Sequence, residues 1–233
     1  MATFVLVQGA WHGSWCWKRV RSALQARGHE VFTPTLTGVG ERSHLLAPGV
    51  NLDTHINDVV NLIKWEELTD VVLVGHSYGG CVISGAADRI AERIGKLVYL
   101  DAFLLENGES LHDTLPPEQR NMQLDLMRQH GDGWMVPPIP AEVFAVNPGD
   151  SAWVNRQCTM QPIATFQQAI TLKGNAKALP TTYILATGWN DSPFPKFCER
   201  AKARGWKTLS VACGHDVMLD KPEELTQILL GLA

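Results

Sequence analysis

Short apolar runs recur along the chain, and glycine, proline or polar residues separate them. Runs of four to six residues rich in Val, Ile and Leu are typical of strands that are buried on both faces of a parallel sheet. We expect strands at residues 4–7, 30–33, 71–74, 96–101, 182–186 and 207–211. The run at 71–74, Val-Val-Leu-Val, is wholly apolar and predicts a strand without an exposed face.

Between these runs the apolar positions recur every three or four residues, which indicates amphipathic helices. One such stretch places Ile56, Val59, Val60 and Ile63 on one face, and Asp53 can cap its N-terminus. Further helices are expected at residues 14–27, 81–87, 118–130, 195–204 and 222–232. Strands that alternate with helices predict an α/β fold, a parallel sheet with helices on both faces.

The pattern changes between residues 105 and 179, where no strong buried strand is visible and prolines are frequent. We interpret this segment as an inserted, mainly helical cap over the active site. The alternative is a separate small domain, but its Leu, Ile and Val content is too dilute for an independent core. The core domain then comprises residues 1–104 and 180–233, and the cap comprises residues 105–179.

The stretch Gly75–Gly80, Gly-His-Ser-Tyr-Gly-Gly, follows the wholly apolar strand and precedes a helix rich in small residues. Strand, G-x-S-x-G and helix together form the nucleophile elbow, a sharp turn that exposes the hydroxyl of its central serine. Glycines on both sides let the strand and the helix pass close together. We therefore predict Ser77 as a nucleophile, against the alternative of a structural glycine-rich turn.

A serine hydroxyl needs a general base and an acid that orients this base. His215 lies directly after the last predicted strand, at the carboxyl edge of the sheet, and has the chain order expected of the base. Two aspartates could orient it. Asp191 follows the strand at 182–186, in the usual place, and Asp101 ends the preceding strand; we favour Asp191.

Ester hydrolysis also requires donors for the negatively charged oxygen of the tetrahedral intermediate. The backbone N–H of Tyr78, directly after the serine, is one expected donor. The other is Ala10, in the loop after the first strand, where Gly9 leaves space for a substrate carbonyl. We interpret His12 as a structural residue of this loop. The indoles of Trp11, Trp15 and Trp17 are expected to pack a helix onto the sheet rather than to line a pocket. We expect pocket residues instead among Phe103, Trp134, Met135, Phe144, Trp153 and Phe166.

Composition narrows the classes of protein. The 233 residues carry a net charge of −4 with scattered basic residues, which does not favour nucleic-acid binding. The five cysteines form no Cys-x-x-Cys motif, so neither a metal site nor a complete disulfide framework is expected, and reduced thiols fit a cytoplasmic protein. No basic leader precedes the first strand, and no apolar run reaches membrane-spanning length. We expect a cytoplasmic enzyme without a membrane partner, and the sequence leaves a homodimer open.

Three stretches together resemble the α/β-hydrolase superfamily. They are residues 4–17 (FVLVQGAWHGSWCW), 75–80 (GHSYGG) and 214–219 (GHDVML). The resemblance points to the branch of plant methylesterases and hydroxynitrile lyases with their bacterial esterase relatives, and it covers the whole chain in order. It implies Ser77, Asp191 and His215 as the catalytic triad and Ala10 and Tyr78 as oxyanion-hole amides.

Three positions separate the esterases from the lyases of this branch. The plant lyases carry threonine where this chain has Gly9, glutamate where it has His76, and lysine where it has Asp216. A lysine after the catalytic histidine suits departing cyanide, whereas a carboxylate there would oppose it. All three differences favour ester hydrolysis. One departure from the esterases is Gln8, since their first loop usually begins His-Gly.

The sequence thus predicts a serine carboxylic ester hydrolase that needs no cofactor and acts on a small hydrophobic or aromatic ester. The alternatives are a carbon–carbon lyase of the hydroxynitrile type and a non-enzymatic receptor for a small ligand. A serine at the elbow, rather than an aspartate, disfavours haloalkane dehalogenation.

Overall fold

One sheet of six strands forms the centre of the computed structural model, which describes all 233 residues. The strand order is β2-β1-β3-β4-β7-β8, and all neighbouring strands are parallel. The bounds are β1 (Thr3–Val7), β2 (Glu30–Phe32), β3 (Val71–His76), β4 (Ile94–Leu100), β7 (Thr181–Ala186) and β8 (Lys207–Val211). Each predicted apolar run supplies one of these strands, which confirms the α/β class.

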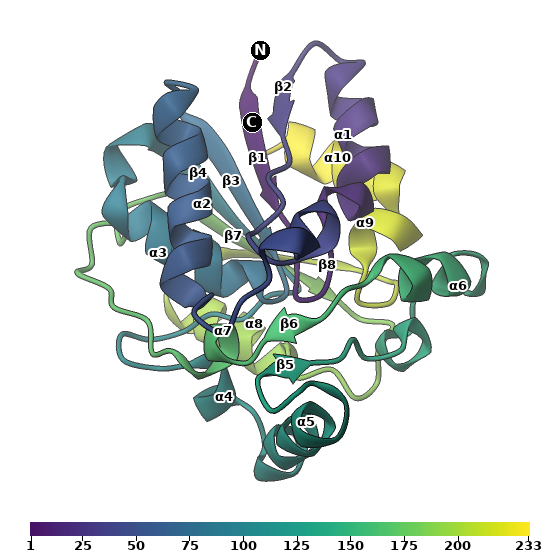
Figure 1. Cartoon of the computed structure of the whole chain (residues 1–233). Coiled ribbons are helices and arrows are strands. Elements are labelled where there is room, and N and C mark those ends of the chain that lie inside the picture. The colour runs from purple at the N-terminus through teal and green to yellow at the C-terminus, as the bar shows by residue number, and fades with distance from the viewer.

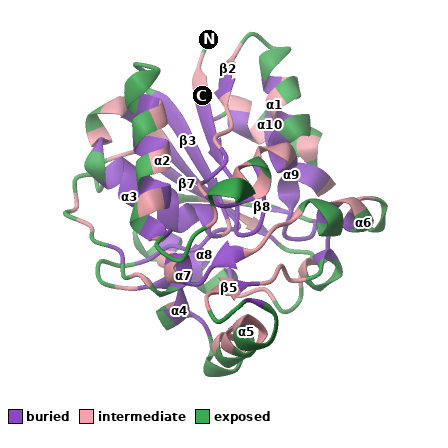
Figure 2. Ribbon diagram, in the orientation of Figure 1, coloured by how far each residue is buried: buried purple, intermediate pink, exposed green.

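Helices cover both faces of the sheet (Figure 1). One face carries α2 (Leu52–Trp65), α3 (Gly79–Arg89) and α8 (Pro195–Ala203); the other carries α1 (Lys18–Gln25), α9 (Val217–Asp220) and α10 (Pro222–Leu230). Side chains of β1 alternate between the two cores, so that Val5 and Val7 face the first group and Phe4 and Leu6 the second. Figure 2 shows the central strands buried and the outer helix surfaces exposed. No helix combines the length and apolarity needed to cross a bilayer.

Two helix starts differ from the sequence prediction. The cap of α2 is Asn51 rather than Asp53. The Asn51 side-chain oxygen accepts a hydrogen bond from the backbone amide of Thr54, and the backbone amide of Asn51 donates to the Thr54 hydroxyl. The predicted helix at 14–27 is divided into the 3₁₀-helix η1 (Ser14–Trp17) and α1. Two further 3₁₀-helices are η2 (Gly40–Leu45) and η3 (Ala91–Arg93).

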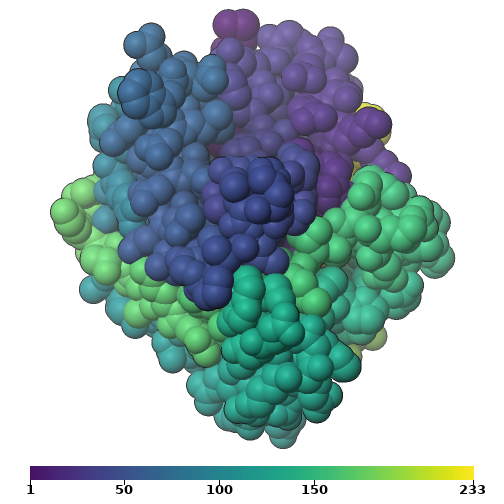
Figure 3. Space-filling view, in the orientation of Figure 1, coloured from purple at the N-terminus to yellow at the C-terminus, as the bar shows by residue number.

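Residues 105–179 leave the sheet after β4 and return to it at β7. They contain α4 (Leu111–Thr114), α5 (Pro117–His130), β5 (Met135–Val136), η4 (Ala141–Phe144), α6 (Pro148–Gln157), β6 (Gln161–Pro162) and α7 (Ala164–Gln167). The antiparallel pair of β5 and β6 is an addition to the predicted helices. In Figure 1 this segment lies beyond the carboxyl ends of the central strands, and in Figure 3 α5 forms the lower end of the visible face, below η2.

Close packing at the elbow depends on glycine. A Cβ at Gly80 would lie 2.2 Å from the carbonyl oxygen of Phe103, which is backbone and cannot move aside. We therefore expect Gly80→Ala to lower the free energy of unfolding by about 3 kcal/mol or more. Gly49→Ala is the matched control, because a Cβ at Gly49 meets nothing within 4 Å. Urea denaturation of both variants tests this, and equal stabilities would contradict it.

Candidate active site

Ser77 lies in the turn between β3 and α3. Its φ is 53°, a left-handed conformation that costs a non-glycine residue about 1–3 kcal/mol. Hydrogen bonds hold this turn on both sides. The Ser77 amide donates to the Leu100 carbonyl (3.2 Å), and the Ser77 carbonyl accepts from the amides of Gly80 (3.0 Å) and Phe103 (3.1 Å). The strained turn is thereby fixed, and Ser77 lines a cavity.

His215 lines the same cavity and makes a short hydrogen bond to a buried carboxylate. Its Nδ1 lies 2.7 Å from Oδ2 of Asp101, and its ring stacks on Phe194 with centroids 4.8 Å apart. Because an ionised carboxylate can only accept, this contact places the imidazole proton on Nδ1 and leaves Nε2 free to take a proton. The other oxygen of Asp101 accepts from the Ala186 amide (3.0 Å). Burial raises the pKa of Asp101, and the hydrogen bond from His215 opposes this effect.

The structure does not bring together His215 and Asp191, the acid favoured from the sequence. Asp191 is exposed in the loop after β7 and lines the cavity without a hydrogen bond to His215. Asp101 directly follows β4, which lies between β3 and β7 in the sheet. Its amide bonds to the Ile184 carbonyl and its carboxylate to the Ala186 amide, so both anchors come from β7. In the structure, the carboxylate bonded to His215 is therefore that of Asp101, the other candidate from the sequence, and not that of Asp191.

The cavity that contains Ser77 and His215 has a volume of about 390 Å³ and a largely apolar wall. The aromatic residues that line it, besides His215, are Trp11, Tyr78, Phe103, Phe144, Phe166, Trp189 and Phe194. Of the expected pocket residues, Phe103, Phe144 and Phe166 line it, whereas Trp134, Met135 and Trp153 do not. Trp11 was expected to pack a helix. Instead its indole donates to the Val136 carbonyl of β5 (3.0 Å), which holds the ring at the cavity.

The two amides expected to bind an oxyanion, those of Ala10 and Tyr78, both belong to residues that line the cavity. Neither amide donates a hydrogen bond to another group of the protein. A Cβ at Gly9 would lie 2.9 Å from Cβ of Ser77, so the first loop approaches the elbow closely. The cap holds this loop at Trp11, whose amide donates to the Gln161 side chain (3.1 Å) and whose carbonyl accepts from the Thr159 amide (3.0 Å).

A buried network that the sequence did not reveal connects this loop to the segment of His215. Nδ1 of His12 lies 2.7 Å from the Ala10 carbonyl, and its Nε2 lies 3.1 Å from Oδ2 of Asp216. The second oxygen of Asp216 is 3.8 Å from Nε2 of His76, which donates to the His215 carbonyl (3.0 Å). The spacing of His12 and Asp216 along the chain gave no signal, because they are 204 positions apart.

Charge on this network follows from its contacts. Burial alone would raise the pKa of Asp216, but the charge and hydrogen bond of His12 outweigh it and hold that pKa well below its ordinary value. Burial alone would lower the pKa of His12, and Asp216 reverses this, so the His12 pKa is raised. His76 differs, because burial and the nearby His215 lower its pKa. The network therefore contains one buried ion pair, between His12 and Asp216, and a neutral His76.

Ligand atoms of His76, His215 and Asp216 lie within 4.8 Å of one another, a grouping that could hold a metal ion. All three already make hydrogen bonds, His76 to the His215 carbonyl, His215 to Asp101 and Asp216 to His12. We therefore describe the cluster as a hydrogen-bonded network and assign no metal to it.

Asp216→Asn should lower the free energy of unfolding by about 3–5 kcal/mol near neutral pH, because it leaves a buried charge on His12 without its partner. Asp220→Asn is the comparison variant. Asp220 ends α9, and its carboxylate is bonded to Asn147 rather than to a histidine. Urea denaturation measures both variants. A loss below 1 kcal/mol in Asp216→Asn would contradict a buried ion pair.

The same pair should make stability depend on pH. The pKa of His12 is raised in the folded protein. Its contribution to the free energy of unfolding is therefore complete below the ordinary pKa of 6.5 and is lost as pH rises through the folded pKa. The pKa of Asp216 is depressed, so its contribution is present above 3.8 and is lost as pH falls through the folded value. Unfolding free energies measured above pH 6.5 should fall with pH in the unmodified protein and fall less in His12→Gln. The exposed His44→Gln is the control, and identical slopes in all three would refute the assignment.

Known proteins resemble this chain over its whole length. A family model described as "Alpha/beta hydrolase family" matches residues 4–228. The carbendazim hydrolyzing esterase of Nocardioides sp. (strain SG-4G) is 47% identical over 244 aligned positions that cover 100% of both chains. Methylesterase 1 of Arabidopsis thaliana is 36% identical over 46% of this chain and 41% of its own. Among solved structures, an extracellular alpha/beta-hydrolase from a Paenibacillus species has a TM-score of 0.86 at 23% identity, over 99% of this chain and 98% of that chain.

Proposed function

The chain belongs to the alpha/beta hydrolase family and is an ester-hydrolysing enzyme, and from this premise we propose that it is a serine carboxylic ester hydrolase that works through an acyl-enzyme. One observation carries the proposal. A serine in a strained elbow and a histidine bonded to a buried carboxylate line the same cavity as two unpaired backbone amides.

In the proposed reaction the Ser77 oxygen attacks the ester carbonyl carbon while Nε2 of His215 takes the hydroxyl proton. Asp101 accepts the hydrogen bond from Nδ1 and stabilises the imidazolium that forms. The bond between the carbonyl carbon and the alcohol oxygen then breaks, and His215 returns the proton to the departing alcohol. A water molecule, deprotonated by His215, attacks the acyl-enzyme, and the carboxylic acid leaves as Ser77 regains its proton.

The amides of Ala10 and Tyr78 are proposed to bind the oxyanion in both tetrahedral intermediates. Their N–H groups have no acceptor in the protein, so no internal hydrogen bond must break when the oxyanion forms. We assign His12 the role of a positioning residue. Its Nδ1 lies 2.7 Å from the Ala10 carbonyl oxygen, and this hydrogen bond fixes the residue whose N–H would bind the oxyanion. A cavity lined mostly by apolar side chains fits a small hydrophobic or aromatic ester as substrate.

Hydrolysis of p-nitrophenyl acetate, butyrate and octanoate tests the proposal, together with labelling by a fluorophosphonate. We expect turnover, and loss of fluoride as the phosphorus bonds to the Ser77 oxygen, seen as an adduct on the Ser77 peptide by mass spectrometry. Carbendazim is an informative further substrate, because a relative that matches the whole chain is named for its hydrolysis. Cyanide release from mandelonitrile without ester turnover would instead support a lyase, and tight ligand binding without labelling would support a receptor.

A further inference from the structure

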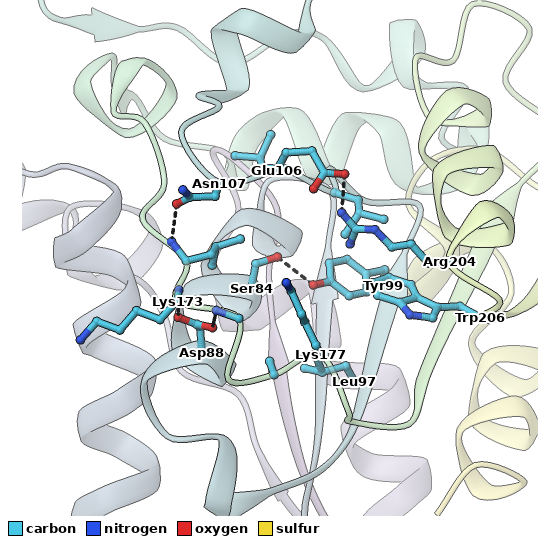
Figure 4. A pocket seen from close by; sticks show the side chains of 15 residues that line it. Ser84, Asp88, Leu97, Tyr99, Glu106, Asn107, Lys173, Lys177, Arg204 and Trp206 are labelled. Carbon is cyan, nitrogen blue, oxygen red and sulfur yellow. Dashed lines mark hydrogen bonds and ion pairs between the residues drawn. The ribbon is translucent and has the colours of Figure 1, made fainter.

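A second cavity, of about 570 Å³, shares no lining residue with the active-site cavity (Figure 4). Its walls come from α3, β4, the segment that follows β4, the loop before β7 and the turn between α8 and β8. Aliphatic residues supply much of the wall, namely Leu97, Leu104, Leu105, Leu172 and Ala176. A cavity of this size and composition can hold a small molecule with an apolar body.

Two hydroxyls form a polar spot in this cavity. Oγ of Ser84 donates to the Gly80 carbonyl (2.7 Å) and lies 2.7 Å from the hydroxyl of Tyr99. Because Ser84 has given its proton to Gly80, the Tyr99 hydroxyl donates to Ser84, and its oxygen keeps lone pairs to accept with. The Tyr99 oxygen therefore attracts a cationic donor rather than an anion.

The acidic groups of the cavity already have hydrogen-bond or ion-pair partners. The Asp88 carboxylate accepts from the amides of Lys173 (2.6 Å), Gly174 (2.8 Å) and Asn175 (2.7 Å). Glu106 pairs with Arg204 at 2.5 Å, which commits that guanidinium. Neither carboxylate forms an ion pair with Lys177, because the Asp88 oxygens accept from backbone amides and Glu106 pairs with Arg204.

Lys177 remains as a cation without a partner. Its amine makes no ion pair and no hydrogen bond in the structure, and Figure 4 shows it pointing toward the hydroxyls of Ser84 and Tyr99. The side chain of Lys173 extends away from these hydroxyls in the same view. The cavity thus combines leucine walls with one unpaired lysine amine directed into it.

We propose that this cavity binds a small monocarboxylate with a hydrocarbon body, its carboxylate on the Lys177 amine and its body against the leucines. One unpaired cation suits a ligand with one negative charge. A phosphate dianion would need a second cation, and Arg204 cannot supply it because it is paired with Glu106. The proposal is independent of the chemistry assigned to Ser77, because the two cavities are separate.

A chemical-shift titration with hexanoate, recorded on leucine methyl groups, tests the proposal. Saturable shifts are expected at Leu97, Leu105 and Leu172. Lys177→Met should raise the Kd for hexanoate about fivefold, the effect expected for a solvent-accessible ion pair. Lys173→Met is the matched control and should leave that Kd unchanged. Hexanamide, the neutral analogue, should bind the unmodified protein and Lys177→Met equally.

Three results would overturn the proposal. The first is an absence of saturable shifts at these leucines. The second is shifts confined to Leu111 and Leu115 of the active-site cavity, which would show hexanoate bound as a product analogue there. The third is an equal Kd in the unmodified protein and in Lys177→Met. Because Lys177 is exposed, the variant should fold, and its methyl spectrum away from the cavity checks this directly.

Discussion

Ser77→Ala is expected to lower kcat for p-nitrophenyl acetate by about four orders of magnitude or more. The serine oxygen forms the acyl-enzyme in the proposed mechanism, and alanine removes that oxygen without adding an atom. The background left should be hydrolysis assisted only by the oxyanion-hole amides and by binding. Exposed Ser22→Ala on α1 is the matched control and should keep full activity.

The conformation of Ser77 adds a second readout to this experiment. At φ 53° a glycine is unstrained, so Ser77→Gly should abolish activity and also raise the free energy of unfolding by about 1 kcal/mol relative to Ser77→Ala. Activity that survives in both variants would remove Ser77 from the mechanism. Equal stability of the two variants would show that the elbow is not strained.

Asp101→Asn is expected to lower kcat about 10⁴-fold, whereas Asp191→Asn should change it less than about threefold. Asparagine at position 101 can donate to Nδ1 of His215, which favours the tautomer with its proton on Nε2 and removes the base; this is the effect known for the equivalent change in the serine protease triad. Asp191 makes no hydrogen bond or ion pair with His215, whose Nδ1 is bonded to Asp101, and it is exposed to solvent. Steady-state kinetics of both variants decides between the two acids.

The opposite ranking, with a large loss in Asp191→Asn and a small one in Asp101→Asn, would restore the acid favoured from the sequence. Asp101 is buried, so its variant needs a stability control. Binding of a fluorophosphonate is unsuitable for this, because it needs the base, whereas near-ultraviolet circular dichroism reports directly on the aromatic residues around the cavity.

Local patterns in the sequence were sufficient for the fold class and for the strands of the central sheet. The apolar runs yielded the four central strands because a strand buried on both faces cannot contain many polar residues, whereas the edge strands β2 and β8 are only partly buried. The elbow was visible for a similar reason, since only glycine allows β3 and α3 to approach so closely. The structure shows this in the 2.5 Å that would separate a Cβ at Gly75 from the Gly79 carbonyl.

The sequence alone placed Ser77 at the elbow and His215 after the last strand, because each position is fixed by the element that immediately precedes it. The tertiary structure decided which carboxylate reaches His215. Asp101 and Asp191 each follow a strand, and only the sheet order and the anchoring of Asp101 on β7 separate them. It also decided the pairing of His12 with Asp216 and the position of the second cavity. A buried charged group needs a partner, and folding brings that partner from a distant part of the chain, so no spacing in the sequence reveals it.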